Sequence, residues 1–185
     1  QLEKAVMSRL RADAEKHAIP GLEEFEANTI GVLEGIGNVA RVDHLSAKLN
    51  GGTDTKKIEQ SRIAFLAELS PGLSVISDND NFHLSIAVAK VHDEKSVQKE
   101  VTKIVDAIKT LGKPHKIDKI SKEVNHEDTK HVAALSSTSK HLATLNGLWG
   151  LVKWPLVNPK NIRDKIYVIL QQNGKHMHFN EIAAA

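Results

Sequence analysis

The sequence predicts a mainly α-helical fold with small β-wings, arranged as tandem winged helix-turn-helix domains. The first observation is a repeated pattern of helix, glycine, short turn and second helix, which begins at Ile30, at Val105 and again at Ile166. The second is a pair of short β-prone runs around a polar turn, placed after the helices of the first repeat. The third is composition. Hydrophobic residues make up 41% of the chain but aromatic residues only 4%, so the cores must be aliphatic, which suits helices.

The overall composition restricts the classes of function. The 185 residues are enough for one or two domains, and 25 basic against 23 acidic residues leave the charge nearly balanced. The chain has no cysteine, which excludes disulfides, thiol catalysis and cysteine-ligated zinc and fits a cytoplasmic location. An apolar run of about 18 residues and a signal peptide are both missing, so we expect no membrane association. Because the first residue is Gln1 and the third repeat stops early, we expect a fragment of a longer protein.

The first repeat occupies residues 22–89 and follows an N-terminal helix with its linker, residues 1–21. Apolar residues at four-residue spacing predict the N-terminal helix over residues 1–18. Within the repeat, apolar periodicity and glycine or proline stops predict three helices, over about residues 22–36, 42–49 and 55–69. Two β-prone runs then flank a polar turn at 77–81 and predict a hairpin. Three helices followed by a hairpin is the order of a winged helix.

The second repeat occupies residues 96–157, and the start of an incomplete third repeat occupies 158–185. The second repeat is predicted to have a first helix that ends at Gly112, and two further helices over about residues 117–124 and 127–145. The next segment, 146–155, is predicted to form a very short wing. Asn158 and Pro159 suit the cap and first-turn positions of the helix that opens the third repeat.

The first two repeats align without a gap, from Ile30 to Asn50 and from Val105 to Asn125. Apolar positions keep their character in five aligned pairs: Leu33 with Ile108, Ile36 with Leu111, Val42 with Ile117, Leu45 with Ile120, and Leu49 with Val124. Matched polar residues accompany them: Asp43 with Asp118, and Ser46 with Ser121. Any two helix pairs share the helical period, but the matched Gly, Asp and Ser favour a genuine duplication.

Two segments of the second repeat have the most specific sequence, Gly112-Lys-Pro-His-Lys-Ile117 and Leu145-Asn-Gly-Leu-Trp-Gly-Leu-Val-Lys-Trp-Pro155. With Gly174-Lys-His-Met-His-Phe-Asn-Glu-Ile-Ala183 of the third, they resemble the HARE-HTH family of winged-helix domains. That family includes the N-terminal domain of the bacterial RNA polymerase delta subunit and domains fused to sigma-factor-like proteins. The resemblance covers about residues 100–185, and it implies a transcription-linked binding module. The first repeat departs from the pattern, with Val39 where the second has Pro114 and with no Trp-Gly-Leu motif.

The third helix of a winged helix usually lies in the DNA major groove, which predicts the candidate binding residues. Arginine and glutamine recognise base edges, whereas lysines and hydroxyls contact phosphates. In the first repeat this helix is predicted to expose Lys56, Lys57, Gln60, Ser61 and Arg62. Its buried side is predicted to consist of Ile58, Ile63 (or Arg62), Phe65, Leu66 and Leu69. In the second repeat the third helix is predicted to offer a hydroxyl-rich surface for DNA or for protein docking, with Lys130, Ser136, Ser137, Thr138, Ser139 and Lys140. An ordinary solvated helix face is the alternative in both repeats.

Lysines also gather near the start of the second repeat. Nine lysines and five acidic residues lie between Lys90 and Lys122. Lys113 and Lys116 fall at the turn before a predicted helix, whose N-terminus would add attraction for phosphate. Lysines that only keep the surface soluble are the alternative.

Histidines and tryptophans are further candidate functional residues. The tightest histidine cluster is His176-x-His178 with Glu181, and His126 and His131 lie five positions apart. Neither has a standard zinc-binding spacing, so we predict no metal and no cofactor. Trp149 and Trp154 can stack on a base or anchor the wing.

These patterns predict a non-enzymatic, transcription-linked protein that binds duplex DNA through tandem winged helices. A protein-interaction module that docks on RNA polymerase or a sigma-like factor is the alternative. A scaffold or homodimerisation unit is a third possibility. No nucleophile, base and orienting residue form a recognisable set, so we expect no enzymatic activity.

Overall fold

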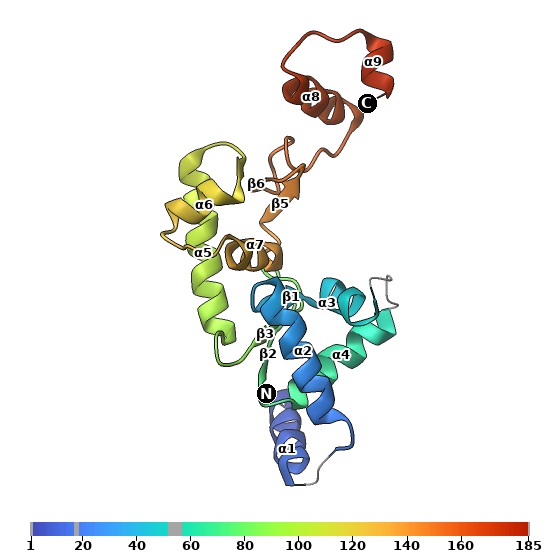
Figure 1. The fold of residues 1–185 in the computed structure, drawn as a ribbon, viewed down its shortest axis with the longest axis vertical. Helices are drawn as coiled ribbons and strands as arrows, with labels where there is room; N and C mark the ends of the chain where they lie inside the picture. Colours follow the sequence, from blue (N-terminus) through green and yellow to red (C-terminus); the bar gives the residue numbers. More distant parts are fainter. Residues whose placement is uncertain (1, 17–18, 52–56, 185) are drawn as a thin grey trace. The chain divides into compact units, whose positions relative to one another are not determined.

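The computed structural model describes residues 2–16, 19–51 and 57–184, and within them the fold is mainly α-helical with two small antiparallel sheets (Figure 1). The chain divides into two compact units. The first unit consists of Gln1–Thr102 and Lys130–Ser139, and the second of Lys103–Thr129 and Lys140–Ala185. The domain boundaries expected from the internal repeat stay a prediction. None of the helices in the described residues is long and apolar enough to cross a membrane.

Seven elements of the first unit come from the N-terminal part of the chain: α1 (Leu2–Lys16), α2 (Leu22–Ile36), β1 (Val39–Arg41), α3 (Val42–Leu49), α4 (Lys57–Leu69), β2 (Leu73–Ile76) and β3 (Ser85–Val88). The strands form an antiparallel sheet in the order β1-β3-β2, and α2, α3 and α4 pack against one another beside it (Figure 1). The core is aliphatic, as the composition predicted. Its buried members are Leu33, Ala40, Val42, Leu45, Ile63, Ala67, Leu73, Ile86 and Val88.

Strand β1 is an element that the sequence analysis missed. Helix α2 ends at Gly37, which has the left-handed φ of 109° that favours glycine, and Asn38 follows with φ of 67°. This reversal directs Val39 toward β3, where it pairs with Ala87. A strand of three residues is too short to have a recognisable alternation, so the sequence alone indicated only a turn here.

The next part of the chain repeats the same order of elements: α5 (Glu94–Leu111), β4 (His115–Lys116), α6 (Ile117–Glu123), α7 (Thr129–Thr138), β5 (Leu142–Leu145) and β6 (Leu148–Leu151). The second sheet has the strand order β4-β6-β5, which corresponds to β1-β3-β2. Aligned positions are also buried alike. Leu33 and Ile108 are 0% and 1% exposed, and Leu45 and Ile120 are both 0% exposed.

The third helix of the second repeat is shorter than predicted. It was expected to continue to Leu145, but α7 ends at Thr138 and residues Leu142–Leu145 form β5. The reason is the turn that follows, where Asn146 and Gly147 have φ of 52° and 74°. Two left-handed residues with the sequence Asn-Gly make the tight hairpin turn whose twist matches a pair of strands. Thus Leu145 pairs with Leu148 across the hairpin instead of completing a helix.

The glycine of the Trp-Gly-Leu motif lies beneath a tryptophan of the second unit. A Cβ on Gly150 would lie 2.8 Å from Cε3 of Trp154, 3.1 Å from Val157 and 3.3 Å from Pro114. Trp154 is half-buried in this packing, and so is Trp149 on β6. The contact favours the wing-anchor interpretation for Trp154.

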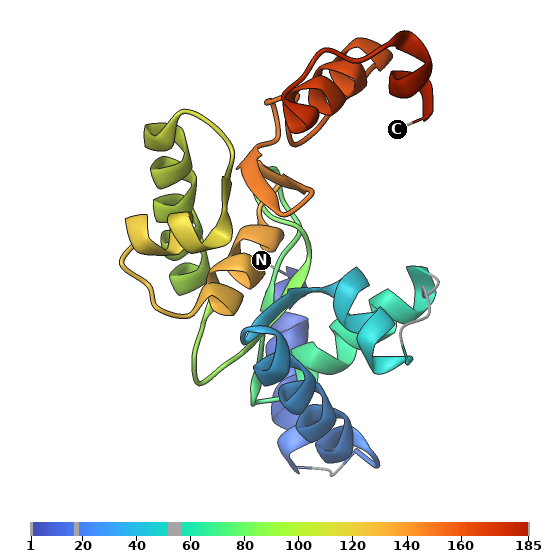
Figure 2. The same cartoon turned by 45° about the horizontal axis from the view of Figure 1, so that its top comes forward.

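The C-terminal residues form two helices, α8 (Ile162–Asn173) and α9 (Phe179–Ala184), which contact each other (Figure 2). Helix α8 begins later than predicted. Asn161, and not Asn158, is its cap, because its side-chain oxygen accepts a hydrogen bond of 2.9 Å from the Asp164 N–H. The helix ends at Gly174, whose φ is 63°.

Candidate functional site

Helix α4 exposes part of the surface that was predicted to contact DNA. Lys57, Ser61 and Arg62 are exposed, and Gln60 is half-buried. Lys56 lies outside the described residues. The Ser61 hydroxyl donates a hydrogen bond of 3.1 Å to the Lys57 carbonyl oxygen, so these two residues lie one turn apart on the same side.

The charge of this α4 surface is only weakly neutralised. Arg62 lies 3.8 Å from Glu59, and both side chains are well exposed, at 71% and 45%. An exposed pair of this kind contributes about 0.2–1 kcal/mol, so the Arg62 guanidinium can exchange it for another anion at little cost. The opposite end of α4 is held by α1, because Arg11 forms an ion pair of 2.6 Å with Glu68. The N-terminal turns of α4 are therefore the accessible ones.

Two apolar side chains share the exposed part of α4. Ile58 is 73% exposed and Phe65 is 48% exposed. Residues 58, 62 and 65 follow the i, i+4, i+7 spacing of one helix face. This face of α4 therefore combines a cation with two apolar groups. The cation suits contact with a nucleic acid, and the apolar groups suit contact with a protein.

The predicted lysines of the second unit are exposed beside a perturbed histidine. Lys113 and Lys116 are both exposed, on either side of His115 in β4. Partial burial lowers the pKa of His115, and the charges of Lys119 and Lys113 lower it further. Lys113, Lys116 and Lys119 are exposed cations around this turn.

Helix α7 presents much less surface than the sequence predicted for a DNA-contacting helix. Its buried residues are His131, Val132, Ala134, Leu135, Ser136 and Thr138. The hydroxyl of Ser137 donates to the Ala134 carbonyl oxygen at 2.6 Å, and Ser137 is half-buried. Lys130 is exposed and Lys140 is half-buried.

The partner that covers α7 within the first unit is the C-terminal end of α2 together with the segment before β3. A Cβ on Gly37 would lie 2.8 Å from the Lys130 carbonyl oxygen and 2.9 Å from the Ala134 Cβ, so the two backbones nearly touch. The His83 N–H also donates to the Thr138 carbonyl oxygen at 2.8 Å. Because both ends of α7 are held in this way, the helix has a structural role that the sequence did not indicate.

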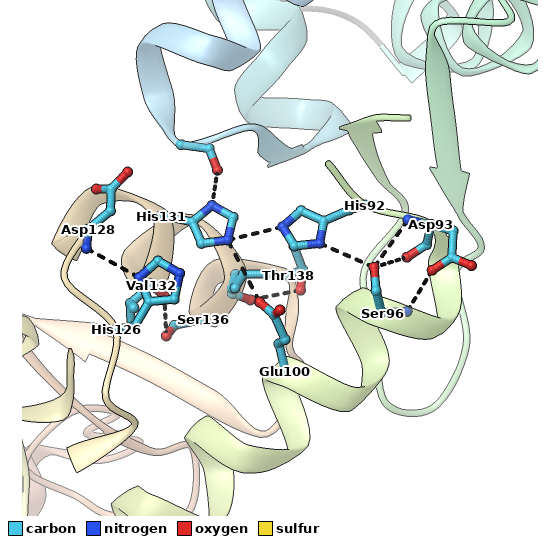
Figure 3. A network of polar contacts seen from close by, with 12 residues as sticks. His92, Asp93, Ser96, Glu100, His126, Asp128, His131, Val132, Ser136 and Thr138 are labelled. Atoms are coloured by element: carbon cyan, nitrogen blue, oxygen red, sulfur yellow. Dashed lines mark hydrogen bonds and ion pairs between the residues drawn. The ribbon is translucent and has the colours of Figure 1, made fainter. Parts of the chain in front are cut away.

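A buried polar network beside α7 was also missed (Figure 3). His92, just before α5, and His131, on α7, are 4% and 5% exposed, and their Nε2 atoms lie 3.0 Å apart. Glu100 of α5 lies with its Oε2 3.7 Å from Nε2 of His131. One candidate ligand atom from each of these three residues lies within 4.8 Å of the others.

The outer side of each histidine ring is held by a separate hydrogen bond. Nδ1 of His131 lies 2.8 Å from the Gly37 carbonyl oxygen, and Nδ1 of His92 lies 3.2 Å from the Ser96 hydroxyl. Ser96 belongs to the cap of α5, where its N–H donates to the Asp93 carboxylate at 2.8 Å. Hydrogen bonds from the Ser96 backbone and then from its side chain hold the pKa of Asp93 below its usual value.

The histidine clusters that the sequence suggested take part in local contacts. His126 accepts a hydrogen bond at Nδ1 from the Asp128 N–H. The Glu181 carboxylate accepts one of 2.8 Å from the His178 N–H at the start of α9. The network of His92, Glu100 and His131 has no sequence signature, because its histidines are 39 residues apart.

No family model matches this chain, and no curated protein or solved structure matches it either. The resemblance to the HARE-HTH family therefore stays a prediction.

Proposed function

We propose that this chain is a non-enzymatic, transcription-linked protein that binds duplex DNA, and that α4 of a winged-helix domain is its principal contact with DNA. The observation that carries the proposal is the exposed basic and polar start of α4, with Lys57, Ser61 and Arg62 at the surface. Helix α4 is the third helix in an order of helix, strand, helix, helix, strand, strand, and this is the position of the DNA-contacting helix in winged-helix proteins.

The chemistry of these side chains suits a duplex. The Arg62 guanidinium can donate two hydrogen bonds to the edge of a guanine, while Lys57 neutralises a phosphate. In the second repeat, Lys113, Lys116 and Lys130 are the exposed cations that can add phosphate contacts. Because α7 is largely buried, we assign no base contact to it, and the proposed interface is asymmetric between the two repeats.

A salt-dependent binding measurement tests the proposal. Fluorescence anisotropy with a labelled duplex would compare the native chain with a Lys57→Ala/Arg62→Ala variant. We expect the double substitution to weaken binding at least about tenfold and, because only Lys57 is assigned a phosphate contact, to reduce the slope of log affinity against log salt by about one. The matched control is Arg163→Ala/Lys165→Ala, which removes the same charge from exposed positions on α8. Equal losses in both variants would contradict a specific role for α4.

Docking on a protein, such as RNA polymerase or a sigma-like factor, is the second candidate function. The specific observation in its favour is the exposure of Ile58 and Phe65 on the same helix. Exposed aromatic and aliphatic groups bind protein partners through burial, which is little affected by salt. A winged-helix domain that docked in this way would use α4 without placing it in a DNA groove.

A second pair of substitutions on α4 separates the two functions. Ile58→Ser/Phe65→Ser removes the apolar groups and leaves both cations in place. If DNA is the partner, this variant keeps its affinity for duplex within about threefold while the Lys57→Ala/Arg62→Ala variant loses it. If a polymerase subunit is the partner, co-sedimentation with purified polymerase persists at high salt and is abolished only by the apolar substitutions.

A further inference from the structure

We propose that His92, His131 and Glu100 form a binding site for a divalent transition-metal ion, with Zn²⁺ as the preferred ion. The proposal does not depend on the DNA-binding function. All three residues belong to the first compact unit, so the site lies within one packed body. His92 precedes α5, Glu100 lies on α5 and His131 lies on α7 (Figure 3).

The separations of the ligand atoms suit one ion. The two Nε2 atoms are 3.0 Å apart, and Oε2 of Glu100 is 3.7 Å from Nε2 of His131. In a tetrahedral site with bonds of about 2.0–2.2 Å, neighbouring ligand atoms lie roughly 3.3–3.5 Å apart. Shifts of a few tenths of an ångström would bring these two distances to those values. The third separation, between His92 and Glu100, lies within 4.8 Å, and a movement of the partly exposed Glu100 side chain would shorten it.

Hydrogen bonds on the outer side of each ring prepare both Nε2 atoms for a metal. The Gly37 carbonyl can only accept, so Nδ1 of His131 is the protonated nitrogen, and its Nε2 keeps a lone pair when the ring is neutral. Metal-bound histidines usually donate a hydrogen bond from the N–H of their second ring nitrogen to a carbonyl or carboxylate in this way. Nδ1 of His92 can donate likewise to the Ser96 hydroxyl, whose own proton is then directed to the Asp93 carbonyl oxygen at 3.0 Å.

Without a metal, the same residues can be linked by hydrogen bonds alone. If the Ser96 hydroxyl donates to Nδ1 of His92, Nε2–H of His92 donates to Nε2 of His131. A metal ion takes the place of that single shared proton, which moves to Nδ1 of His92 as the ring changes tautomer, and the Ser96 hydroxyl turns its own proton to the Asp93 carbonyl oxygen. Two buried histidines therefore have satisfied hydrogen bonds in either state. In the metal-bound state the Glu100 carboxylate, already 3.7 Å from Nε2 of His131, becomes the third ligand.

The donor set decides the kind of ion. Two neutral imidazoles and one carboxylate suit Zn²⁺, Co²⁺ or Ni²⁺, whereas Mg²⁺ and Ca²⁺ prefer oxygen donors alone. The Glu100 side chain is 36% exposed, which gives an ion a route from solvent, and its negative charge offsets part of the ion's charge. Three protein ligands leave one position for water. The expected role is to join α7 to the 92–100 segment, so the ion would stabilise the packing of α7.

Titration of the metal-free chain tests the site. We expect Co²⁺ to produce the intense visible absorption of a tetrahedral complex, and Zn²⁺ to displace it with one equivalent bound. Glu100→Gln and His92→Gln should each weaken Zn²⁺ binding at least about tenfold, since loss of even an outer-shell partner costs 10–100-fold. Zn²⁺ should also raise the thermal unfolding midpoint of the native chain, and Mg²⁺ at the same concentration should not.

Two controls keep the result interpretable. His176→Ala/His178→Ala removes the exposed histidine pair of the C-terminal segment and should leave the affinity unchanged. Glu100→Gln is the principal variant because its half-exposed side chain can be changed without loss of the fold, and far-UV circular dichroism of the metal-free protein verifies this. Equal Zn²⁺ affinity in the native chain and both site variants would overturn the proposal. So would absence of the tetrahedral Co²⁺ spectrum, or loss of binding only in the His176→Ala/His178→Ala variant.

Discussion

His131 and Gly37 are 94 residues apart in the chain, yet Nδ1 of His131 lies 2.8 Å from the Gly37 carbonyl oxygen. The contact exists because residue 37 has no side chain. A Cβ there would lie 2.8 Å from the Lys130 carbonyl oxygen, closer than a real Cβ approaches another atom. The glycine that ends α2 therefore also allows α7 to dock, and this relationship underlies the first prediction.

Gly37→Ala should destabilise the first unit by about 2–4 kcal/mol, which combines the cost of a left-handed alanine with that of overpacking. Urea unfolding followed by circular dichroism measures the effect. Gly112 is the matched control, because it aligns with Gly37 and has φ of 69° but no atom within 4 Å of an added Cβ. Gly112→Ala should cost only the strain, about 1–2 kcal/mol. Equal losses at the two positions would show that docking of α7 does not depend on Gly37.

Gly150→Ala should disturb the second hairpin, because the new methyl group would lie 2.8 Å from the Trp154 ring. We expect a loss of about 1–3 kcal/mol and a changed near-UV circular dichroism signal from the displaced indole. Gly31→Ala is the control, since Gly31 lies within α2 with open space around it. That substitution should stabilise the protein slightly, by about 0.5–1 kcal/mol. An unchanged tryptophan signal in Gly150→Ala would refute the packing of Trp154 on this glycine.

Asp93 should make stability depend on acid pH. Hydrogen bonds from Ser96 lower its pKa in the folded state below the ordinary value of 3.8. The carboxylate therefore contributes stability that is fully present above pH 3.8 and is lost as the pH falls through the lower folded pKa. Asp93→Asn keeps an acceptor for the cap of α5 but cannot ionise, so its unfolding free energy should lack this part of the pH dependence. Chemical denaturation at a series of acid pH values measures the unfolding free energy of both proteins. If the native chain and the Asp93→Asn variant lose the same unfolding free energy as the pH falls, the expectation is wrong.

His115 should destabilise the second unit when it becomes protonated. Partial burial, Lys119 and Lys113 lower its folded pKa below the ordinary value of 6.5. Because the unfolded chain takes up the proton first, stability is complete above pH 6.5 and declines as the pH falls toward the folded pKa. His115→Gln should remove this decline, whereas His141→Gln, at an exposed position after α7, should retain it. NMR titration of the imidazole resonance gives the folded pKa directly, and a value at or above 6.5 would contradict the expectation.

The parts of the fold that depend on residues close together in the sequence were largely predictable. The mainly α-helical class with small sheets is confirmed, and α2 ends at the predicted Gly37. The aligned pair Leu45 and Ile120 is completely buried at both positions, because each occupies the inner side of a short amphipathic helix. The predicted helix through Leu145 was wrong because the left-handed Asn146-Gly147 turn joins Leu142–Leu145 to the next strand as a hairpin, and this pairing prevails over the apolar helical period.

Of the candidate sites, the exposed part of α4 followed from the sequence and the network around His131 did not. Lys57 and Arg62 are exposed as predicted. The prediction that Ile58 and Phe65 lie on the buried side of α4 was wrong, because they are 73% and 48% exposed.

By contrast, the predicted polar surface of α7 is covered in part: Ser136, Thr138 and Ser139 are buried, whereas Lys130 is exposed. Its serine and threonine hydroxyls bond to carbonyls of their own helix, so hydroxyl content was a poor guide to exposure.

The sequence by itself determined the aliphatic cores, the glycine stops and the recurrence of one helical pattern, since each depends on residues within a few turns of one another. Only the tertiary structure decided that β1 pairs with β3, that α7 is buried against the end of α2, and that His92, Glu100 and His131 converge. Those contacts join residues tens of positions apart, and their distances depend on how whole helices pack, which no local period encodes.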